Sequence, residues 1–360
     1  MSKVICGIQQ IGIGVSNLYE AWKWYIKAFG VDIRIFEDNT VAELMLPYTG
    51  GQPQKRHAAL AINLDGGGGF EIWQYSGRTP LPPINELQLG DLGIVGAKVK
   101  CFNAEVAHKH LTTLNPKLIS PISICPAGQK HFFVQDPFNN LFNVIEVTNG
   151  WFRKPSKPTG ATYGAIIGVS DIDKAMTVYG EILEFDKVLA DSTGNFDDLQ
   201  YLKGGQGKFR RVILTHSKPR RGAFSRMLGD SQIELIQALD RTPKKIYEGR
   251  FWGDLGFIHL CFDIRRMGEL ESECQLKGFP FTVNSNVKHN QQGSFDMGEA
   301  AGHFAYIEDP DGTLIEFVET HKVPIAKKVG IFLNLSKRND EKPLPNWIVK
   351  MLGIKKARIS

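Results

Sequence analysis

The chain has 360 residues, a formal net charge of +5 and a hydrophobic fraction of 42%. This composition is typical of a folded protein of two or three domains. No apolar run reaches the roughly 20 residues of a membrane-spanning helix, and the charge is too small by itself to indicate a nucleic-acid-binding protein. We therefore expect neither nucleic acid nor a membrane as a partner.

The N-terminal residues and the cysteines indicate a cytoplasmic protein. The first apolar stretch is short and is broken at Gln9 and Gln10, unlike a signal peptide. The cysteines are odd in number, form no Cys-x-x-Cys pair and mostly lie in apolar runs, which predicts reduced structural thiols. They are Cys6, Cys101, Cys125, Cys261 and Cys274.

The first module of the chain is predicted to be a strand, a helix and three further strands. The strand covers residues 7–15, and Asn17 caps a helix with Glu20 at the capping-box position. Gly30 ends that helix after Phe29. Extended segments follow at residues 41–45, 57–63 and 70–75.

The same βαβββ order is predicted three more times. The second module has a strand at 93–101, a helix at 104–114 and strands near 131–134 and 141–147. The third has a strand at 163–169, a helix at 171–183 and strands near 199–202, 211–215 and 232–237. The fourth has a strand at 257–264, a helix at 267–277 and strands near 279–283, 303–307 and 314–318. Strand–helix openings followed by antiparallel strands predict an α+β fold.

An internal repeat shows that the chain is a tandem duplication. The stretch Gly90–Gly96 recurs as Gly253–His259, and Phe70–Pro80 recurs as Ile233–Pro243, both displaced by 163 residues. A Pro- and Lys-rich linker, Arg153–Gly160, separates the halves. We expect one domain at 1–152, a second at 160–322 and a basic tail at 323–360.

Polar residues within apolar strands are the candidate functional residues. His259 lies in the apolar run Gly256–Ile264, and Glu316 lies between apolar neighbours after the Asp309-Pro-Asp-Gly turn. A buried imidazole and a buried carboxylate are costly unless they pair or bind a cation. Two such residues on two strands of one sheet indicate a metal site.

Four βαβββ modules with these residues resemble the vicinal oxygen chelate superfamily, the group of glyoxalase I, bleomycin-resistance proteins and extradiol dioxygenases. The resemblance covers residues 4–320, with Ile8–Val15 and Asp309–Glu316 as its supporting motifs. It implies four modules paired into two glyoxalase-like domains. It also implies ligands from the first and last strands of each module around one divalent metal.

The resemblance assigns a ligand position to each of these eight strands. The first-strand position lies seven residues before the helix cap, which gives Gln10, Gly96, Gly164 and His259 in chain order. The closing-strand positions are Glu71, Asn143, Glu234 and Glu316.

If neighbouring modules pair in order, the C-terminal half holds the metal site. Its ligands are then His259, Glu316 and Glu234, with Gly164 as a blank, and Gln10 and Glu71 form a possible second site. This donor set suits Zn, Ni, Mn, Co or Fe. The missing ligand at Gly164 departs from the four-ligand pattern of glyoxalase I and from the two-His pattern of iron dioxygenases.

Three functions remain open at this point. The first is a metal-dependent lyase or isomerase that stabilises an enediolate of a small oxygenated substrate, with His303 or Glu234 moving the proton. The second is a non-haem iron dioxygenase. The third is a binding protein of the bleomycin-resistance type whose apolar cups are lined by Phe132, Phe142 and Trp73. Whether the chain forms a homodimer is left open as well.

Overall fold

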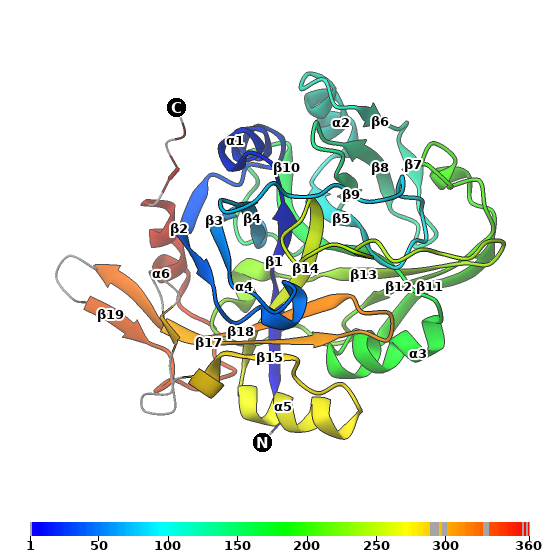
Figure 1. Cartoon of the computed structure of the whole chain (residues 1–360). Helices are drawn as coiled ribbons and strands as arrows, with labels where there is room; N and C mark the ends of the chain where they lie inside the picture. Colours follow the sequence, from blue (N-terminus) through cyan, green and yellow to red (C-terminus); the bar gives the residue numbers. More distant parts are fainter. Residues whose placement is uncertain are drawn as a thin grey trace.

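The protein folds into two curled β-sheets with helices packed on them, the expected α+β fold (Figure 1). This computed structural model describes residues 2–288, 295–296, 301–326, 331–354, 356, 357 and 359. Of the basic tail residues, Lys327, Lys328, Lys355 and Arg358 lie outside that range. No helix in the described ranges is long and apolar enough to cross a membrane.

The first sheet has ten strands from the two ends of the chain, in the order β15-β17-β18-β14-β1-β4-β3-β2. Two short strands, β16 and β19, pair with β17 and β18. The bounds are β1 (Val4–Gly14), β2 (Ile33–Ala42), β3 (Gln54–Ile62), β4 (Gly69–Tyr75), β14 (Gly256–Arg265), β15 (Val283–Asn284), β16 (Phe295–Asp296), β17 (Ala301–Glu308), β18 (Leu314–Ala326) and β19 (Ile331–Asn334).

The second sheet has nine strands from the middle of the chain, in the order β11-β12-β13-β10-β5-β9-β8-β6, with β7 paired to β8. The bounds are β5 (Gly93–Cys101), β6 (Leu118–Ile119), β7 (Ser123–Ile124), β8 (Lys130–Gln135), β9 (Leu141–Glu146), β10 (Thr159–Gly168), β11 (Lys187–Gly194), β12 (Phe209–Thr215) and β13 (Gln232–Ala238).

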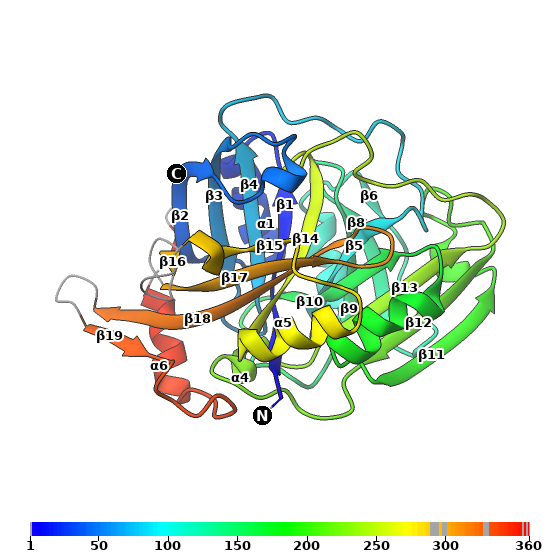
Figure 2. The ribbon, with the colours of Figure 1, turned by 60° about the horizontal axis from the view of Figure 1, so that its bottom comes forward.

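The four modules do not pair in sequence order. The first strands of modules one and four, β1 and β14, form an antiparallel pair, and β10 and β5 join modules three and two in the same way. Figure 2 shows the orange strands β17 and β18 in one sheet with the blue strands of the N-terminus. Each sheet therefore takes strands from both halves, 1–152 and 160–322, and in-order pairing was the wrong expectation.

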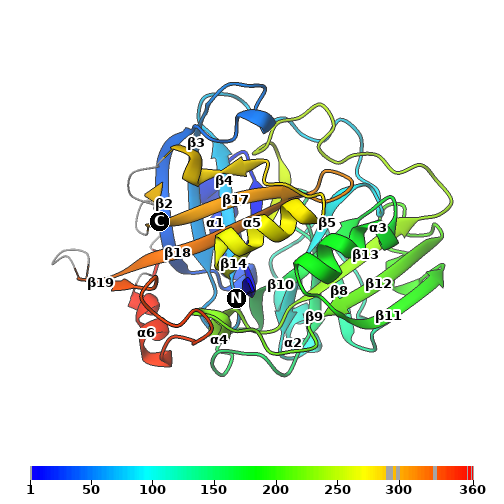
Figure 3. The ribbon, with the colours of Figure 1, turned by 90° about the horizontal axis from the view of Figure 1, so that it is seen from below.

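Most of the helices lie against these sheets. The chain forms α1 (Leu18–Phe29), α2 (Ala104–Thr112), α3 (Ile172–Met176), α4 (Ser225–Leu228), α5 (Met267–Leu276) and α6 (Asn346–Lys350). Asn17 caps α1 by accepting a hydrogen bond from the Glu20 amide, and Gly30 ends it in a left-handed conformation, both as predicted. Helices α3 and α5 lie side by side (Figure 3), where Lys277 pairs with Glu181.

Two matching contacts connect the modules inside each half. The hydroxyl of Tyr25 on α1 donates to Asp136, 2.7 Å away, and the hydroxyl of Tyr179 donates to Asp309, 2.8 Å away. Both carboxylates are the first residue of a repeated Asp-Pro turn and are buried. The repeated turn is therefore a structural joint of the duplicated fold.

The predicted elements differ from the structure mainly at the sheet edges. Residues 41–45 and 199–202 were expected to be strands, but the edge strands run earlier, over β2 and β11. Both strands are largely exposed and polar. Backbone pairing with β3 and β12 holds them in place, so no apolar alternation marks them. The helix expected at 171–183 is a short α3 followed by a π-helical turn, Thr177–Ile182.

Candidate metal centre

His259 lies in the middle of the first sheet and is fully buried. It occupies β14, directly opposite Gly12 on β1. A β-carbon at Gly12 would lie 2.5 Å from the imidazole, so only glycine leaves room for this ring. The glycine in Ile8–Val15 thus makes space for a histidine that is distant in sequence.

Three more polar residues come from the strands next to His259. Gln10 on β1 faces Cys261 on β14, and Glu316 on β18 lies beside Cys261 from the other side. Glu71 on β4 lies beside Gly12. Four adjacent strands, β4, β1, β14 and β18, therefore place four polar side chains together.

The four side chains form one tight, buried cluster. The imidazole Nε2 of His259 lies 3.3 Å from a carboxylate oxygen of Glu71 and 3.1 Å from one of Glu316. The Gln10 amide lies 3.2 Å and 3.4 Å from the same two carboxylates. Ligand atoms of His259, Glu71 and Glu316 all lie within 4.8 Å of one another. All four residues are at most 8% exposed.

Electrostatics in the cluster favour a positive charge at its centre. Burial lowers the pKa of His259, but the carboxylates of Glu316 and Glu71 outweigh burial and raise this pKa to about 9. Burial raises the pKa of Glu316, but His259 outweighs it, together with hydrogen bonds from Tyr306 and Cys261, and lowers this pKa. Two carboxylates thus converge on one point, where a proton on His259 or a divalent metal would balance their charge.

The cluster fits a divalent metal. Among the described residues, Nδ1 of His259 and Oε1 of Gln10 are buried without a hydrogen-bond partner, which is rare for polar atoms of a native interior. The Gln10 amide can turn over, because its oxygen and nitrogen are nearly indistinguishable in shape. In that orientation Oε1 would face the carboxylates, and one imidazole, two carboxylates and one amide oxygen suit a metal such as Zn, Ni, Mn, Co or Fe.

Aromatic side chains enclose the cluster on the same face of the sheet. The Trp252 ring lies parallel to the His259 ring with centroids 6.2 Å apart, and the Tyr306 ring meets His259 edge-on at 5.6 Å. Trp73 packs edge-on against Trp252 at 4.8 Å. We call the concave face with these rings and the four polar residues the metal cup.

Glu234 is not part of the metal cup, which corrects its assignment as a metal ligand. It lies on β13 in the second sheet and bonds to Lys98 at 2.6 Å and to Arg211 at 2.7 Å. Arg211 also holds Asp198 at 2.8 Å. The error came from pairing modules three and four, whereas module three pairs with module two. We call the face with this ion network the second cup.

Gln10 and Glu71 take the place that Glu234 and Gly164 were expected to have. They were predicted as a possible second site, and the structure brings them to His259 and Glu316 instead. The candidate for the missing fourth ligand is thus Gln10, on the first strand of module one. The ligand positions assigned from the resemblance already included all four residues. Only the module that pairs with module four was predicted wrongly.

His303, the predicted proton-transfer residue, lies away from the cluster. Its ring nitrogen is 2.7 Å from Asn284 Oδ1. Along β17, Phe304 and Tyr306 pack in the metal cup, so strand alternation places His303 on the opposite face of the sheet. The structure gives it no contact with the metal cup.

The apolar residues expected to line a cup are divided between two places. Trp73 does line the metal cup. Phe132 and Phe142 belong instead to the main core, where the ring of Phe142 lies 4.6 Å from that of Phe29 on α1. Sequence reasoning missed Trp252. Its equivalent in the repeat, 163 residues earlier, is Leu89, so the two halves differ at this position.

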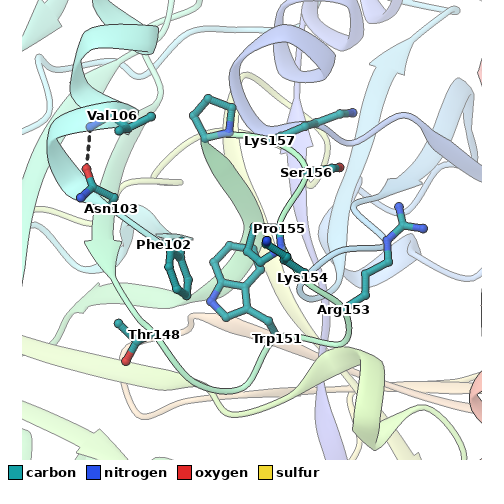
Figure 4. Close-up of a pocket in the computed structure, with 11 residues that line it drawn as sticks. Phe102, Asn103, Val106, Thr148, Trp151, Arg153, Lys154, Pro155, Ser156 and Lys157 are labelled. Atoms are coloured by element: carbon teal, nitrogen blue, oxygen red, sulfur yellow. Dashed lines mark hydrogen bonds between the residues drawn. The ribbon is translucent and has the colours of Figure 1, made fainter.

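A separate surface cavity of about 630 Å³ lies along the linker, lined by Phe102, Trp151 and neighbours (Figure 4). No residue of the metal cluster lines it. Two of its cationic residues have partners nearby, since Arg153 pairs with Asp65 and Lys157 pairs with Asp32. The cavity is therefore separate from the candidate metal centre.

Comparisons with solved structures show the fold. Glyoxalase I from Zea mays matches with a TM-score of 0.51 and 12% identity, over 88% of this chain and 92% of that one. A point mutant of the same enzyme matches with a TM-score of 0.55 and 13% identity, over 88% and 92%. A Bacillus subtilis protein provisionally described as a dioxygenase matches with a TM-score of 0.53 and 14% identity, over 88% and 86%.

No protein-family model matches the chain, and no curated protein sequence matches it. At these identities the structural likeness defines the fold alone. The chain has the fold of the vicinal oxygen chelate superfamily, as the sequence resemblance implied.

Proposed function

We propose that the protein is a metal-dependent lyase or isomerase of the glyoxalase type. The observation that carries the proposal is the cluster of Gln10, Glu71, His259 and Glu316, built where modules one and four join. This set has the four ligands of the glyoxalase I pattern. It holds a single histidine and so lacks the two-His, one-carboxylate set of non-haem iron oxygenases.

A divalent metal in this cluster would polarise a substrate carbonyl and stabilise the enediolate formed from it. His259 and Glu316 are the firmly placed members of the set. Tyr306 and Cys261 both hydrogen-bond to Glu316, which fixes its carboxylate. Such partners of a ligand typically set its orientation.

Glu71 is the better candidate to move a proton. Both carboxylates contact the Gln10 amide and His259, but the further hydrogen bonds from Tyr306 and Cys261 go to Glu316. A carboxylate with fewer restraints can rotate and reach the carbon next to a polarised carbonyl. We therefore assign Glu71 as the base that takes a proton from the substrate and returns it.

The aromatic rings of the metal cup would support this chemistry by excluding water. Trp73, Trp252 and Tyr306 are nearly fully buried around the cluster. A low-polarity enclosure strengthens the attraction between a cation and an oxyanion and protects an enediolate from side reactions.

The test is proton exchange on simple α-hydroxyketones. Protein purified without a metal-affinity tag is stripped, reloaded with Ni²⁺, Co²⁺, Zn²⁺ or Mn²⁺, and incubated in D₂O with dihydroxyacetone or the hemithioacetal of methylglyoxal and glutathione. NMR then follows deuterium at the carbon next to the carbonyl.

We expect exchange with at least one metal and none for the stripped protein. Glu71→Gln should show no exchange even at a metal concentration high enough to fill its weakened site. Metal uptake without exchange on any probe would contradict the proposal. Oxygen consumption with Fe²⁺ and a catechol would instead support dioxygenase chemistry.

A further inference from the structure

The metal cup is closed, so a substrate must move something to reach the metal. His259 is fully buried, and Gln10, Glu71 and Glu316 are 4%, 8% and 7% exposed. The strands that carry them are paired on both sides in the middle of a ten-stranded sheet. Opening the cup through the strands would break these ladders. Opening it through the segment that covers the rings would not.

Trp252 lies on that segment, between β13 and β14. Its ring is parallel to His259 at 6.2 Å and also contacts Trp73 and Tyr306, at 4.8 Å and 6.4 Å. Trp252 is 6% exposed, and its indole N–H has no hydrogen-bond partner within the described part of the chain. A buried donor without a partner costs free energy, and an oxygen of a bound ligand would satisfy it.

The segment around Trp252 is shaped to fit the cup. Gly253 has φ +96°, which a side chain rarely adopts, and a β-carbon there would lie 2.2 Å from the Trp73 ring. The Trp252 amide donates to the Tyr48 carbonyl at 2.9 Å, and the hydroxyl of Tyr75 donates to the Trp252 carbonyl. These contacts hold the segment around Trp252 against the aromatic rings of the metal cup.

A buried ion pair fixes the position of the segment. The carboxylate of Asp254, fully buried, accepts from Arg78 and from the amides of Leu81 and Phe251, each at 2.8 Å. Arg78 also lies over the rings of Tyr75 and Phe251, at 4.6 Å and 5.0 Å. Arg78 is 22% exposed in its side chain, so the pair sits at the edge of the cup.

The duplication supplies a second copy of this pair for comparison. Arg241 bonds to Asp91 at 2.7 Å, and these residues correspond to Arg78 and Asp254 at the same displacement of 163 residues. The repeated Arg-Thr-Pro and Gly-Asp-Leu-Gly motifs therefore form two ion pairs between the halves. In each pair the arginine comes from one half and the aspartate from the other. In the second cup the counterpart of Trp252 is Leu89, which has no indole donor.

We propose that Trp252 is the gate and ligand-contacting residue of the metal cup, held in place by the Arg78–Asp254 pair. The indole moves aside to admit a small ligand with adjacent oxygens, then closes over it and donates its N–H to one of those oxygens. Arg78 is a positioning residue that acts through Asp254. This inference rests on the proposed metal site.

The test uses full-length protein loaded with Co²⁺ and acetohydroxamate as a probe with two adjacent oxygens. Visible absorption of Co²⁺ reports the Kd of the probe, and loss of that absorption in EDTA reports how fast the metal is reached. The variants are Trp252→Phe, which keeps a ring without the N–H, Trp252→Leu, Arg78→Met and the matched control Arg241→Met.

For Trp252→Phe we expect unchanged Co²⁺ content and about tenfold weaker acetohydroxamate binding, the loss of one hydrogen bond. Arg78→Met should release Co²⁺ to EDTA at least about tenfold faster, with Trp252→Leu similar and Arg241→Met close to wild type. Wild-type affinity in Trp252→Phe, or equal release from Arg78→Met and Arg241→Met, would overturn the proposal. A wild type that takes up no Co²⁺ would instead remove the proposed function beneath it.

Discussion

The metal cup and the second cup have matching strand pairs, but their buried carboxylates are balanced by different partners. In register, Gln10, Glu71, His259 and Glu316 of the metal cup correspond to Gly164, Glu234, Gly96 and Asn143 of the second cup. These counterparts are fixed by matching strand pairs, since Gln10 lies beside Gly69 on the parallel strand just as Gly164 lies beside Gln232. Of these four positions in the second cup, Glu234 alone holds a carboxylate.

The second cup neutralises that carboxylate with protein cations. Lys98, which corresponds to Cys261, puts its ammonium 2.6 Å from Glu234, and Arg211 bonds to Glu234 and Asp198. His131 lies 3.2 Å from Asp198. The four polar groups of the metal cup include no lysine or arginine, so their two carboxylates can be balanced by a bound metal or by a proton on His259. In the second cup one carboxylate faces a lysine and an arginine, which indicates a closed structural network.

The largest difference between the cups should appear when His259 is changed. His259→Ala removes the single imidazole and leaves two carboxylates facing each other. We expect bound metal to fall from about one per chain to a small fraction, an effect beyond the roughly 100-fold seen when only a supporting residue of a metal ligand is lost. Elemental analysis measures it, and unchanged stoichiometry would contradict the assignment of His259.

The second cup should respond in stability instead. Glu234→Gln leaves Lys98 and Arg211 buried with one counter-charge fewer, which should cost about 3–5 kcal/mol in free energy of unfolding at pH 7. Urea unfolding at low temperature gives the value. A double variant, Lys98→Met with Glu234→Leu, removes the charges together and should lose much less stability. Equal losses in the two variants would argue against an ion network.

This network also predicts a pH dependence. Burial alone would raise the pKa of Glu234, but Arg211 and Lys98 outweigh burial and lower it to about 2, below its ordinary 4.5. The ionised carboxylate therefore stabilises the fold above about pH 4.5, and this contribution is lost as pH falls toward 2. The stability difference between wild type and Glu234→Gln should shrink over that window. A difference independent of pH would show that Glu234 is not ionised in the fold.

A smaller effect is expected at the glycine that makes room for His259. Gly12→Ala would bring a β-carbon within 2.5 Å of the imidazole, so the ring must shift. We expect metal affinity to fall about tenfold or more. Gly96→Ala in the second cup is the control, since its nearest neighbour would be a backbone oxygen at 3.2 Å. Competition with a coloured chelator compares the two, and equal affinities would show that the ring has free space.

The smallest effect is expected from an attempt to restore the second cup. The double variant Gly96→His with Asn143→Glu supplies two of the missing ligands, but Lys98 still holds Glu234. At Gly164 a β-carbon would lie 1.6 Å from the Gln232 carbonyl oxygen, so the fourth ligand has no room. Metal content should stay at about one per chain, and a rise to two would refute this reading of Lys98.

Much of this architecture could be predicted because it depends on local patterns. Apolar alternation marked the central strands, and Asn17 with Gly30 marked the ends of α1. The repeat and the ligand positions assigned from the resemblance included all four residues of the cluster. The polar edge strands β2 and β11 were missed because backbone pairing, rather than side-chain burial, holds them in place.

The partner of each module could not be read from the sequence. Pairing of β1 with β14 joins residues some 250 positions apart, and no local pattern favours it over pairing β10 with β14. Gly12 lacks a β-carbon and so leaves space for His259, which favours the pairing of β1 with β14. This role can be recognised only once the structure places the two residues opposite each other. The roles of Trp252 and Arg78 depend on the same long-range pairing.

The most direct test of the account compares two glutamates at equivalent positions of the duplicated chain. Glu71→Gln and Glu234→Gln are each stripped, reloaded with Co²⁺ and analysed for metal per chain, with circular dichroism to confirm the fold. A site built from modules one and four predicts that Glu71→Gln binds Co²⁺ far more weakly while Glu234→Gln keeps about one Co²⁺. Loss of the metal in Glu234→Gln with full binding in Glu71→Gln would contradict it and place the site within the C-terminal half.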